Sequence, residues 1–403
     1  MIRVSSVNIR GSRNFVVLGG VGTIGRVVVR DLFESHPQNH ITIADYNAAG
    51  ARRYARSLRS RRVHGVFADA SKAAQLAQLF RDHSVVINCT QHDFNLHVMR
   101  AAIAANVHYV DLGGLFYWTR KQLKLNARFK RAGLTAILGA GCAPGITNVM
   151  TRAAADKLER IESVQIRVGT ADLTPSRGRN KRDSRESQTL RGSTLVFPYS
   201  AQTIVEEFTL PPWIFERGRF RQVKPRTAWE QVNFPPPVGK QWLIRTRHSE
   251  VATIPLTFRR QGLRFCDFKV GFERSFVREV MKRLNAGWTV RELAKLQIPP
   301  GQPNDYEIAR VVARGKGRTL TVDCAARANK RWPASAGDID TGCPPSIVAQ
   351  MIVTGEITQR GVLAPEVAVP VGPFFGELRK RGMKVAIRVG QTGKGHRPRR
   401  RKP

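Results

Sequence analysis

His248 and Glu250 offer acid–base chemistry, because a carboxylate two positions away can orient an imidazole. An imidazole titrates near neutral pH, so it can accept a proton in one direction of a reaction and return it in the other. If the segment is a strand, both side chains point to one face. We take His248 and Glu250 as the first catalytic candidates and His92 as the second. The alternative for either histidine is a surface or capping role.

A glycine turn within residues 15–45 predicts a nucleotide site. The segment reads as an apolar strand, a glycine turn, an amphipathic helix and a second strand that ends on an acid. Gly20 would give the sharp bend, Gly22 the approach to a pyrophosphate, and Gly25 the close packing of helix on strand. Asp45 stands at the spacing expected of the carboxylate that binds an adenosine ribose. The pattern is typical of a dinucleotide-binding βαβ unit; the alternative is an ordinary tight turn.

Strand-like and helix-like patterns alternate through the first 150 residues. This alternation predicts a Rossmann-type, doubly wound parallel sheet, with ligands beyond the carboxyl ends of its strands. The strand candidates are 15–18, 41–44, 63–67, 85–89, 108–112 and 135–138.

Three polar segments follow these strands. Segment 88–95 (NCTQHDFN) lies where a nicotinamide ribose usually passes, and 67–71 (FADAS) would flank an adenine ring, although Asp69 can equally be a helix N-cap. Segment 138–148 (LGAGCAPGITN) opens a helix over 146–158 and can offer N–H groups to a carboxylate; the alternative is a simple domain crossover. Cys142 has no evident catalytic partner there, so packing explains it better.

The second half of the chain has a different pattern of hydrophobic residues. Alternating strands at 164–168, 242–246, 266–270 and 319–322 predict an α+β domain with a mixed or antiparallel sheet for substrate binding and oligomerisation. Tyr199, before an amphipathic helix, either contacts substrate or anchors that helix. Apolar residues on more than one face predict a buried helix over 346–357, with TGCPP as a preceding turn and Ser346 as its cap. The predicted divisions are 1–13, 14–148, 149–340, helices over 341–388 that return to the first domain, and a basic tail over 389–403.

Composition sets broad limits. A chain of 403 residues with 42% hydrophobic content can bury two cores. No signal-peptide pattern occurs in residues 1–14, and no apolar run is long enough to cross a membrane, which favours a cytoplasmic protein without membrane partners. The five dispersed cysteines lack CxxC spacing, which argues against a disulfide framework or a zinc site, and no metal is predicted.

The net charge of +37 has two explanations. Either the chain binds nucleic acid through its basic surface, or arginine has spread over a solvated surface through genome bias. Basic residues occur throughout the chain, which favours the second explanation. Two segments, 176–185 and the tail at 393–403, are especially basic but lack interleaved aromatic residues for base stacking.

Several motifs together resemble one enzyme family. The glycine turn, VVINCT, HYVDLGG, GLTAILGAGCAPGITN, RHSEVATIP, and TGCPPSIVAQM followed by RGVLAPE resemble the saccharopine dehydrogenase-like reductases, which include enzymes similar to lysine 6-dehydrogenase and carboxynorspermidine synthase. The resemblance covers residues 14–387. It implies a homodimer and hydride transfer between NAD(P) and an amine-bearing carbon of an amino acid or polyamine-like substrate.

The resemblance also implies roles by position. The substrate pocket would include Pro144 and Gly145. Ala143 stands where fungal-type saccharopine reductases tend to have an acidic residue, which argues against saccharopine itself. The implied cofactor contacts are Gly20, Gly22, Thr23, Ile24 and Gly25 at the pyrophosphate, Asp45 at the ribose, Asp69 and Ala70 on the adenine side, and Cys89 and Thr90 on the nicotinamide side.

Asp45 predicts NAD as the cofactor. Its charge would repel the 2′-phosphate of NADP, although Arg52 and Arg53 on the following helix could partly offset that repulsion. NADP therefore stays possible. The sequence predicts an oxidoreductase acting on C–N bonds; the alternative is an inactive Rossmann protein that senses nucleotides or associates with nucleic acid through its basic tail.

Overall fold

The computed structural model describes residues 13–174, 190–191, 194–195, 197, 199–295 and 303–391. Residues 1–12 and the two basic segments at 176–185 and 393–403 lie outside the described residues. The predictions of an N-terminal extension and of a nucleic-acid-binding tail therefore stay predictions.

In the described part of the chain, the first sheet has seven strands, all paired in parallel. The strand order confirms the predicted doubly wound sheet. Strands β1 to β3 are added toward one edge and strands β4 to β6 toward the other, so the topological switch point lies between β1 and β4. Alternate residues of β1 enter opposite cores, since Phe15 and Val17 belong to one buried cluster and Val16 and Leu18 to another. In sheet order the strands are β3 (Val63–Phe67), β2 (His40–Asp45), β1 (Asn14–Leu18), β4 (Val85–Asn88), β5 (His108–Asp111), β6 (Thr135–Ile137) and β17 (Gly361–Leu363).

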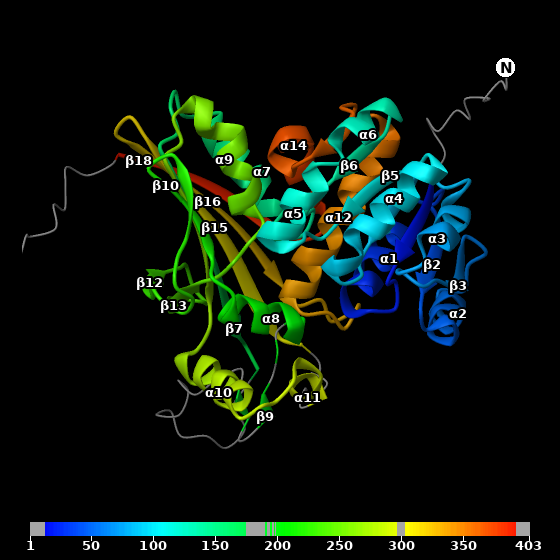
Figure 1. Cartoon of the computed structure of the whole chain (residues 1–403), viewed down its shortest axis with the longest axis horizontal. Coiled ribbons are helices and arrows are strands. Elements are labelled where there is room, and N and C mark those ends of the chain that lie inside the picture. The colour runs from blue at the N-terminus through cyan, green and yellow to red at the C-terminus, as the bar shows by residue number, and fades with distance from the viewer. Residues whose placement is uncertain are drawn as a thin grey trace, which may run out of the picture.

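Helices cover both faces of this sheet, as such double burial requires (Figure 1). They are α1 (Thr23–Ser35), α2 (Ala48–Ser57), α3 (Ala73–Phe80), the 3-10 helix η1 (His92–Phe94), α4 (Asn95–Ala105), α5 (Leu115–Leu123) and α6 (Asn126–Arg131).

The second sheet has nine strands among the described residues and is mixed, as predicted. Strands β14 and β7 pair in parallel, and the remaining pairs are antiparallel. Its main path runs β11 (Arg219–Gln222), β10 (Trp213–Glu216), β14 (Phe265–Gly271), β7 (Ser163–Asp172), β15 (Asp305–Gly315), β16 (Arg318–Arg327) and β18 (Lys384–Gln391), while β12 (Glu230–Asn233) pairs with β13 (Lys240–Arg245), which pairs with β14.

Helix α7 packs against β15 and β16, and α9 packs against β14. The helices and small strands of this half are α7 (Ile146–Ala155), α8 (Ala201–Thr209), α9 (Glu250–Phe258), η2 (Arg259–Gln261), α10 (Arg274–Asn285), α11 (Val290–Lys295), β8 (Leu190–Arg191) and β9 (Thr194–Leu195).

Helix α12 (Ala336–Thr354) begins earlier than the sequence indicated. The prediction of a TGCPP turn capped by Ser346 is wrong, because Pro344 and Pro345 lie inside the helix and Ser335 is the cap, paired with Asp338 in a capping box. Tertiary packing overrides the proline signal: α12 contacts α1, β4, β5, β15 and β16, and Figure 1 shows it between the two sheets. Its middle is buried throughout.

The chain after α12 contributes to both sheets. Helices α13 (Pro365–Ala368) and α14 (Val371–Lys380) were expected, but β17 joins the first sheet beside β6 and β18 joins the second beside β16. The purely helical prediction for 341–388 is therefore wrong for these two strands. Strand β17 is too short to give a signal in isolation, whereas the alternation of Val385, Ile387 and Val389 was an available signal for β18.

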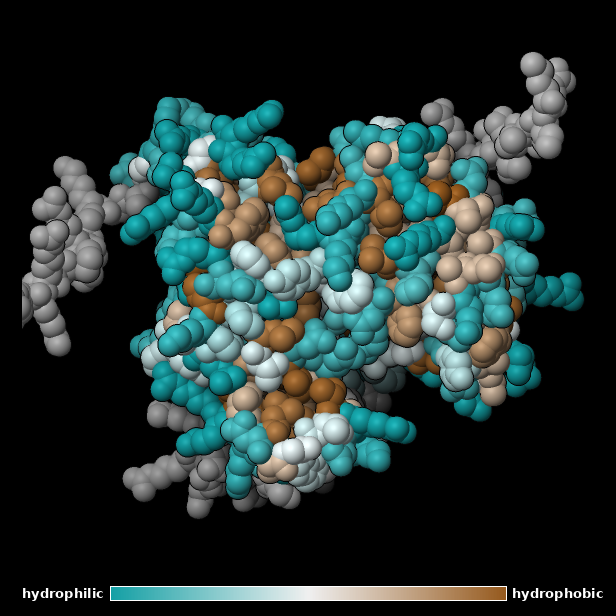
Figure 2. Space-filling model, viewed as in Figure 1, coloured by the Kyte–Doolittle hydropathy of each residue, from teal (hydrophilic) through white to brown (hydrophobic). Residues whose placement is uncertain are grey.

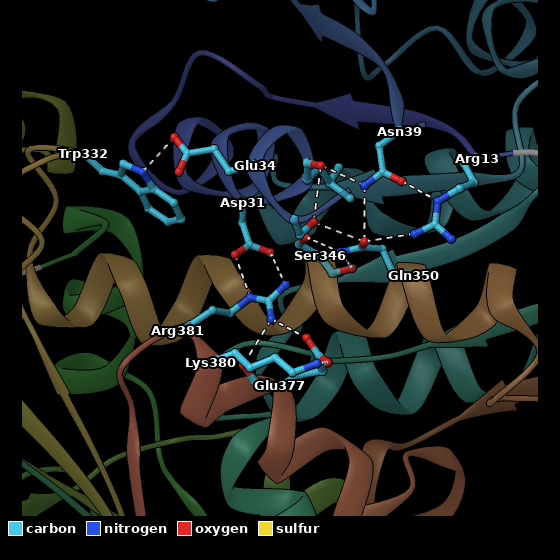
Figure 3. A network of polar contacts seen from close by, with 12 residues as sticks. Arg13, Asp31, Glu34, Asn39, Trp332, Ser346, Gln350, Glu377, Lys380 and Arg381 are labelled. Atoms are coloured by element: carbon cyan, nitrogen blue, oxygen red, sulfur yellow. Dashed lines mark hydrogen bonds and ion pairs between the residues drawn. The ribbon is translucent and has the colours of Figure 1, made fainter. Parts of the chain in front are cut away.

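A polar network fixes α12 to the first sheet's layer (Figure 3). The Oε1 atom of Gln350 accepts hydrogen bonds from Asn39 Nδ2 and Arg13 Nη2, each at 3.2 Å. Arg13 Nε also donates to Asn39 Oδ1 at 2.7 Å. These contacts join residues that lie far apart in the sequence, so helix α12 is an integral part of the nucleotide-binding half.

The visible face of the molecule is hydrophilic along most of its outline, with hydrophobic residues seen mainly nearer its middle (Figure 2). No helix in the described ranges is both long enough and apolar enough for a membrane span.

Candidate active site

The glycine turn after β1 has no room for side chains. A Cβ on Gly25 would lie 2.2 Å from the carbonyl oxygen of Gly19, so α1 packs as closely on the strand as predicted. The positive φ of the bend falls at Gly19 (77°) and not at Gly20. Gly20 lies in the same turn, where a Cβ would lie 2.8 Å from the Ile43 side chain and 2.9 Å from the Val17 carbonyl oxygen.

The start of α1 is open to a ligand. Gly22 is the N-cap, no side chain caps the helix, and both Gly22 and Thr23 are exposed. The first N–H groups of a helix have no partner within it, and the helix dipole favours negative charge there. These features fit the pyrophosphate of a dinucleotide.

Asp45 lies at the carboxyl end of β2, next to the glycine turn. Its Oδ2 accepts from Val21 N at 3.1 Å and its Oδ1 from Asn47 N at 2.9 Å. The carboxylate is thus held beside the start of α1, where a ribose adjoining the pyrophosphate would lie. Arg52 and Arg53 are exposed on α2.

The predicted adenine side carries two aromatic residues: Phe67, which begins the predicted segment 67–71, and Tyr46, which sequence reasoning missed. Tyr46 and Phe67 are 74% and 52% exposed, and their ring centroids lie 5.5 Å apart. Tyr46 directly follows β2, and Phe67 ends β3. This position at the carboxyl ends of two neighbouring strands was the sequence signal for a ligand-facing role. Asp69 accepts from the backbone and hydroxyl of Ser71, while Lys72 is the N-cap of α3, so the N-cap alternative for Asp69 is wrong.

The predicted nicotinamide side lies across the turn. A Cβ on Gly19 would lie 3.0 Å from the carbonyl of Cys89, which places the end of β4 against the glycine turn. Thr90 donates from Oγ1 to Asn88 Oδ1 at 2.7 Å. Burial raises the pKa of the Cys89 thiol, so the thiol is neutral and does not act as a charged nucleophile.

His248 and Glu250 meet as predicted. Glu250 opens α9, and its Oε2 contacts Nδ1 of His248. The imidazole also stacks on Phe268, with ring centroids 3.7 Å apart and planes 8° apart. His248 is only 8% exposed, which excludes the surface alternative. Thr147 completes the support by donating to Glu250 Oε1 at 2.8 Å.

A second carboxylate faces the other nitrogen of His248. Glu207 Oε1 on α8 lies 3.9 Å from Nε2, and Glu207 Oε2 accepts from the hydroxyl of Tyr199 at 2.6 Å. Burial opposes protonation of His248, but Glu250 and Glu207 together outweigh it and raise the histidine pKa. Burial raises the pKa of Glu207 to about 7. Sequence reasoning missed Glu207, because its distance from His248 along the chain gave no signal.

His92 reaches the same helix. Its Nε2 lies 3.4 Å from Glu206 Oε2 and 3.5 Å from Asp93 Oδ1. Because Glu206 and Glu207 are neighbours on α8, this helix brings both predicted histidines to one region. His92 is 8% exposed and lies in η1, directly after the predicted nicotinamide side.

The segment that carries His248 is held against helix α5. Ser249 Oγ donates to Leu115 O at 3.1 Å and accepts from Thr119 Oγ1 at 3.2 Å. The loop before Leu115 is held by Asp111, which sequence reasoning missed as a positioning residue. Its carboxylate accepts from Gly113 N at 2.9 Å, Gly139 N at 2.7 Å and Tyr109 Oη at 2.8 Å.

The bend at 138–148 is a crossover between the sheets. The N–H groups of Gly145, Ile146 and Thr147 donate to Asn148 Oδ1, Gly141 O and Cys142 O. These three N–H groups are thus used internally and are not available to a carboxylate. Pro144 fills the space between Gly113 and Gly139, where added Cβ atoms would lie 2.8 Å and 2.5 Å from its Cγ.

Cys142 belongs to a buried acidic cluster. Its Sγ and carboxylate oxygens of Glu307 and Asp340 all lie within 4.8 Å of one another. Burial raises the pKa of the thiol and of Asp340, and it raises that of Glu307 to about 8. The thiol holds its proton and has no basic partner in this cluster, so packing describes Cys142 best.

Comparisons with known proteins agree with this geometry. Residues 15–137 match the family model described as the saccharopine dehydrogenase NADP binding domain, and residues 141–383 match the saccharopine dehydrogenase C-terminal domain. The carboxyaminopropylagmatine dehydrogenase of Synechocystis sp. is 21% identical over an alignment 409 positions long, gaps included, and the alignment covers 91% of this chain and 96% of that protein.

Apo saccharopine dehydrogenase (L-Glu forming) from Saccharomyces cerevisiae shares the fold. The TM-score is 0.69 at 14% identity, with 94% of this chain and 100% of that chain covered. The family resemblance drawn from the motifs is confirmed by the two family models, which together span both halves of the protein. The chain therefore belongs to the saccharopine dehydrogenase family and is an NAD(P)-dependent dehydrogenase.

Proposed function

We propose that the protein transfers a hydride between NAD(P) and an amine-bearing carbon of an amino acid or polyamine-like substrate. The observation that carries the proposal is His248, which is fixed by Glu250 and seated beside the strand ends that would face a nicotinamide. The name of the Synechocystis relative, a dehydrogenase of a carboxylated, amine-bearing compound, supports the same class.

The residues supply binding and proton transfer, and the bound cofactor would accept or donate the hydride. Glu250 occupies Nδ1 of His248, so Nε2 is the nitrogen that can take the N–H proton of a substrate amine. In the reverse direction the imidazolium returns that proton. Tyr199, Pro144 and Gly145 stay predicted substrate contacts.

The charge of the site favours a cationic substrate. Asp93, Glu206, Glu207 and Glu250 converge around the two histidines in a chain whose net charge is +37. A concentration of acids in so basic a protein would attract ammonium groups and raise their local concentration. A substrate with more than one amine fits this field better than a dicarboxylic acid.

The test is a screen of lysine, saccharopine and carboxylated polyamines against NAD and NADP, read by nicotinamide absorbance. We expect turnover with a polycationic amine. Cofactor binding is measured first by NADH fluorescence, and absence of binding at millimolar NADH would refute the proposal.

We propose NAD as the preferred cofactor. Asp45 is anchored by Val21 N and Asn47 N, so its charge cannot easily move away from an added 2′-phosphate. The variant Asp45→Ala is expected to lose the preference for NAD over NADP. A wild-type protein that binds NADPH more tightly than NADH contradicts this assignment.

We also propose that β18 mediates a homodimer. This strand is the edge of the second sheet in the described residues, and nearly all of it is exposed, including Ile387 and Val389. An exposed edge with apolar residues is suited to pairing with another strand. The double variant Ile387→Lys, Val389→Lys should give monomers in light scattering; a monomeric wild type contradicts the proposal.

A further inference from the structure

Glu207 is the buried acid at His248 that the proposed chemistry leaves without a task. Its side chain is almost fully buried on α8, yet it makes no pair with an arginine or lysine among the described residues. An acid in such a place is costly to keep unless it is stabilised or used. Its two contacts are the hydroxyl of Tyr199 at 2.6 Å and Nε2 of His248 at 3.9 Å.

The geometry of His248 directs its reactive nitrogen toward Glu207. Glu250 holds Nδ1, and the stacked Phe268 ring keeps the imidazole from turning over. Nε2, which would take the substrate proton, therefore lies on the Glu207 side. The 3.9 Å separation is longer than a hydrogen bond, so proton transfer needs a small rotation of either side chain.

These groups lie in the order Glu250, His248, Glu207 and Tyr199, and only the last is exposed. Glu250 is 0% exposed, Glu207 2%, His248 8% and Tyr199 36%. Tyr199 is thus the member that reaches solvent, while the reactive imidazole is enclosed. An enclosed base that collects a proton in each turnover needs a route to release it.

We propose that Glu207 and Tyr199 form a proton relay between His248 and solvent, an inference that rests on the proposed function. When the amine is oxidised, its N–H bond breaks and an N–H bond forms at Nε2 of His248. That proton passes to a carboxylate oxygen of Glu207. The Tyr199 hydroxyl, which donates to Glu207 before the transfer, turns toward water, so that its oxygen takes the proton from Glu207 as the tyrosine's own proton leaves to water. The sum is one proton released, and all three groups return to their starting state.

The other charged groups nearby do not replace this route. Glu206 faces His92 and accepts from Gln202, and Arg247 donates to Pro211 O while lying over the ring of Tyr117. Burial has the largest effect on the pKa of Tyr199 and raises it. Glu307 affects this pKa only through its charge. Burial raises the pKa of Glu207 to about 7, so this carboxyl can hold or release a proton at neutral pH.

The first test needs no substrate. The titration of His248 is followed by NMR in the full chain, with its signal assigned by the loss of that signal in His248→Gln. Glu207→Gln is expected to lower the pKa of His248 by about one unit, because a nearby negative charge is removed. The control Glu216→Gln neutralises a surface acid paired with Arg221 and should leave that pKa unchanged. An unchanged His248 pKa in Glu207→Gln overturns the relay.

The second test uses Tyr199→Phe, which removes one hydroxyl from a partly exposed residue and spares the fold. With a substrate found in the screen, kcat at low buffer concentration should fall by about tenfold and recover when imidazole is added as a proton carrier. Equal rates for the wild type and Tyr199→Phe at low buffer overturn the relay. No turnover by the wild type with any amine refutes the proposed function instead, and the NMR result then stands on its own.

Discussion

Arg381 binds Asp31 of α1 through two hydrogen bonds, from Nε to Oδ1 at 2.6 Å and from Nη2 to Oδ2 at 2.9 Å (Figure 3). The two side chains are 10% and 4% exposed. Arg381 follows α14, and its Nη1 also pairs with Glu377. The last helix is thereby fixed to the first helix of the nucleotide-binding half.

Loss of this ion pair should strongly destabilise the protein. Arg381→Ala leaves the Asp31 carboxylate buried without its partner, which typically costs about 3–5 kcal/mol. Urea denaturation measures the change in the free energy of unfolding. The control Lys380→Ala breaks an exposed pair with Glu377 and should change that free energy by less than about 1 kcal/mol. Equal effects of the two variants would show that Asp31 finds another partner.

Gly25→Ala should weaken cofactor binding. The new Cβ would lie 2.2 Å from the Gly19 carbonyl, and that contact is backbone, which cannot rotate away. The turn must shift, so we expect at least a tenfold weaker NADH affinity by fluorescence and a loss of roughly 1–3 kcal/mol in stability. Gly372→Ala in α14 is the matched control, since nothing lies within 4 Å of its Cβ position. Normal NADH affinity in Gly25→Ala would argue against this turn as the binding site.

His248→Gln should remove the chemistry and spare cofactor binding. General acid–base catalysis contributes about 10²–10⁴-fold, so kcat should fall by that factor while NADH affinity is unchanged. His92→Gln is measured beside it, because both histidines face α8. A larger loss for His92→Gln would reverse the assignment of the two histidines.

The acidic cluster around Cys142 predicts a pH dependence of stability. Burial raises the pKa of Glu307 to about 8, whereas an unfolded glutamate titrates near 4.3, so the folded state binds the extra proton. The contribution to stability is fully present below about pH 4 and is lost as the pH rises toward 8, by at most about 1.4 kcal/mol per pH unit for one proton.

The test measures the free energy of unfolding at several pH values. Glu307→Gln should flatten the decline between pH 4 and 8. The control Glu159→Gln removes a surface acid paired with Lys316 and should keep the wild-type slope. A slope that persists in Glu307→Gln would assign the titration to Asp340.

The sequence predicted the parts of the site that depend on local pattern. The close packing at Gly25 and the pairing of His248 with Glu250 both follow from spacing within one segment, and both occur in the structure. Glu207 could not be predicted, because tertiary packing of α8 brings it to the histidine. The error at Ser346 has the same cause, since contacts with two sheets keep Pro344 and Pro345 inside a helix.

The placement of β17 and β18 has a practical consequence for dissecting this protein. The backbone passes between the two sheets after β6, again after β16, and again between β17 and β18. A fragment that ends after β6 would lack β17, the strand that pairs with β6 in the intact sheet. A fragment of the second half alone would carry β17 with no sheet to join. Neither half corresponds to one continuous stretch of gene, so expression of an isolated nucleotide-binding module requires a circular permutation or co-expression of two pieces.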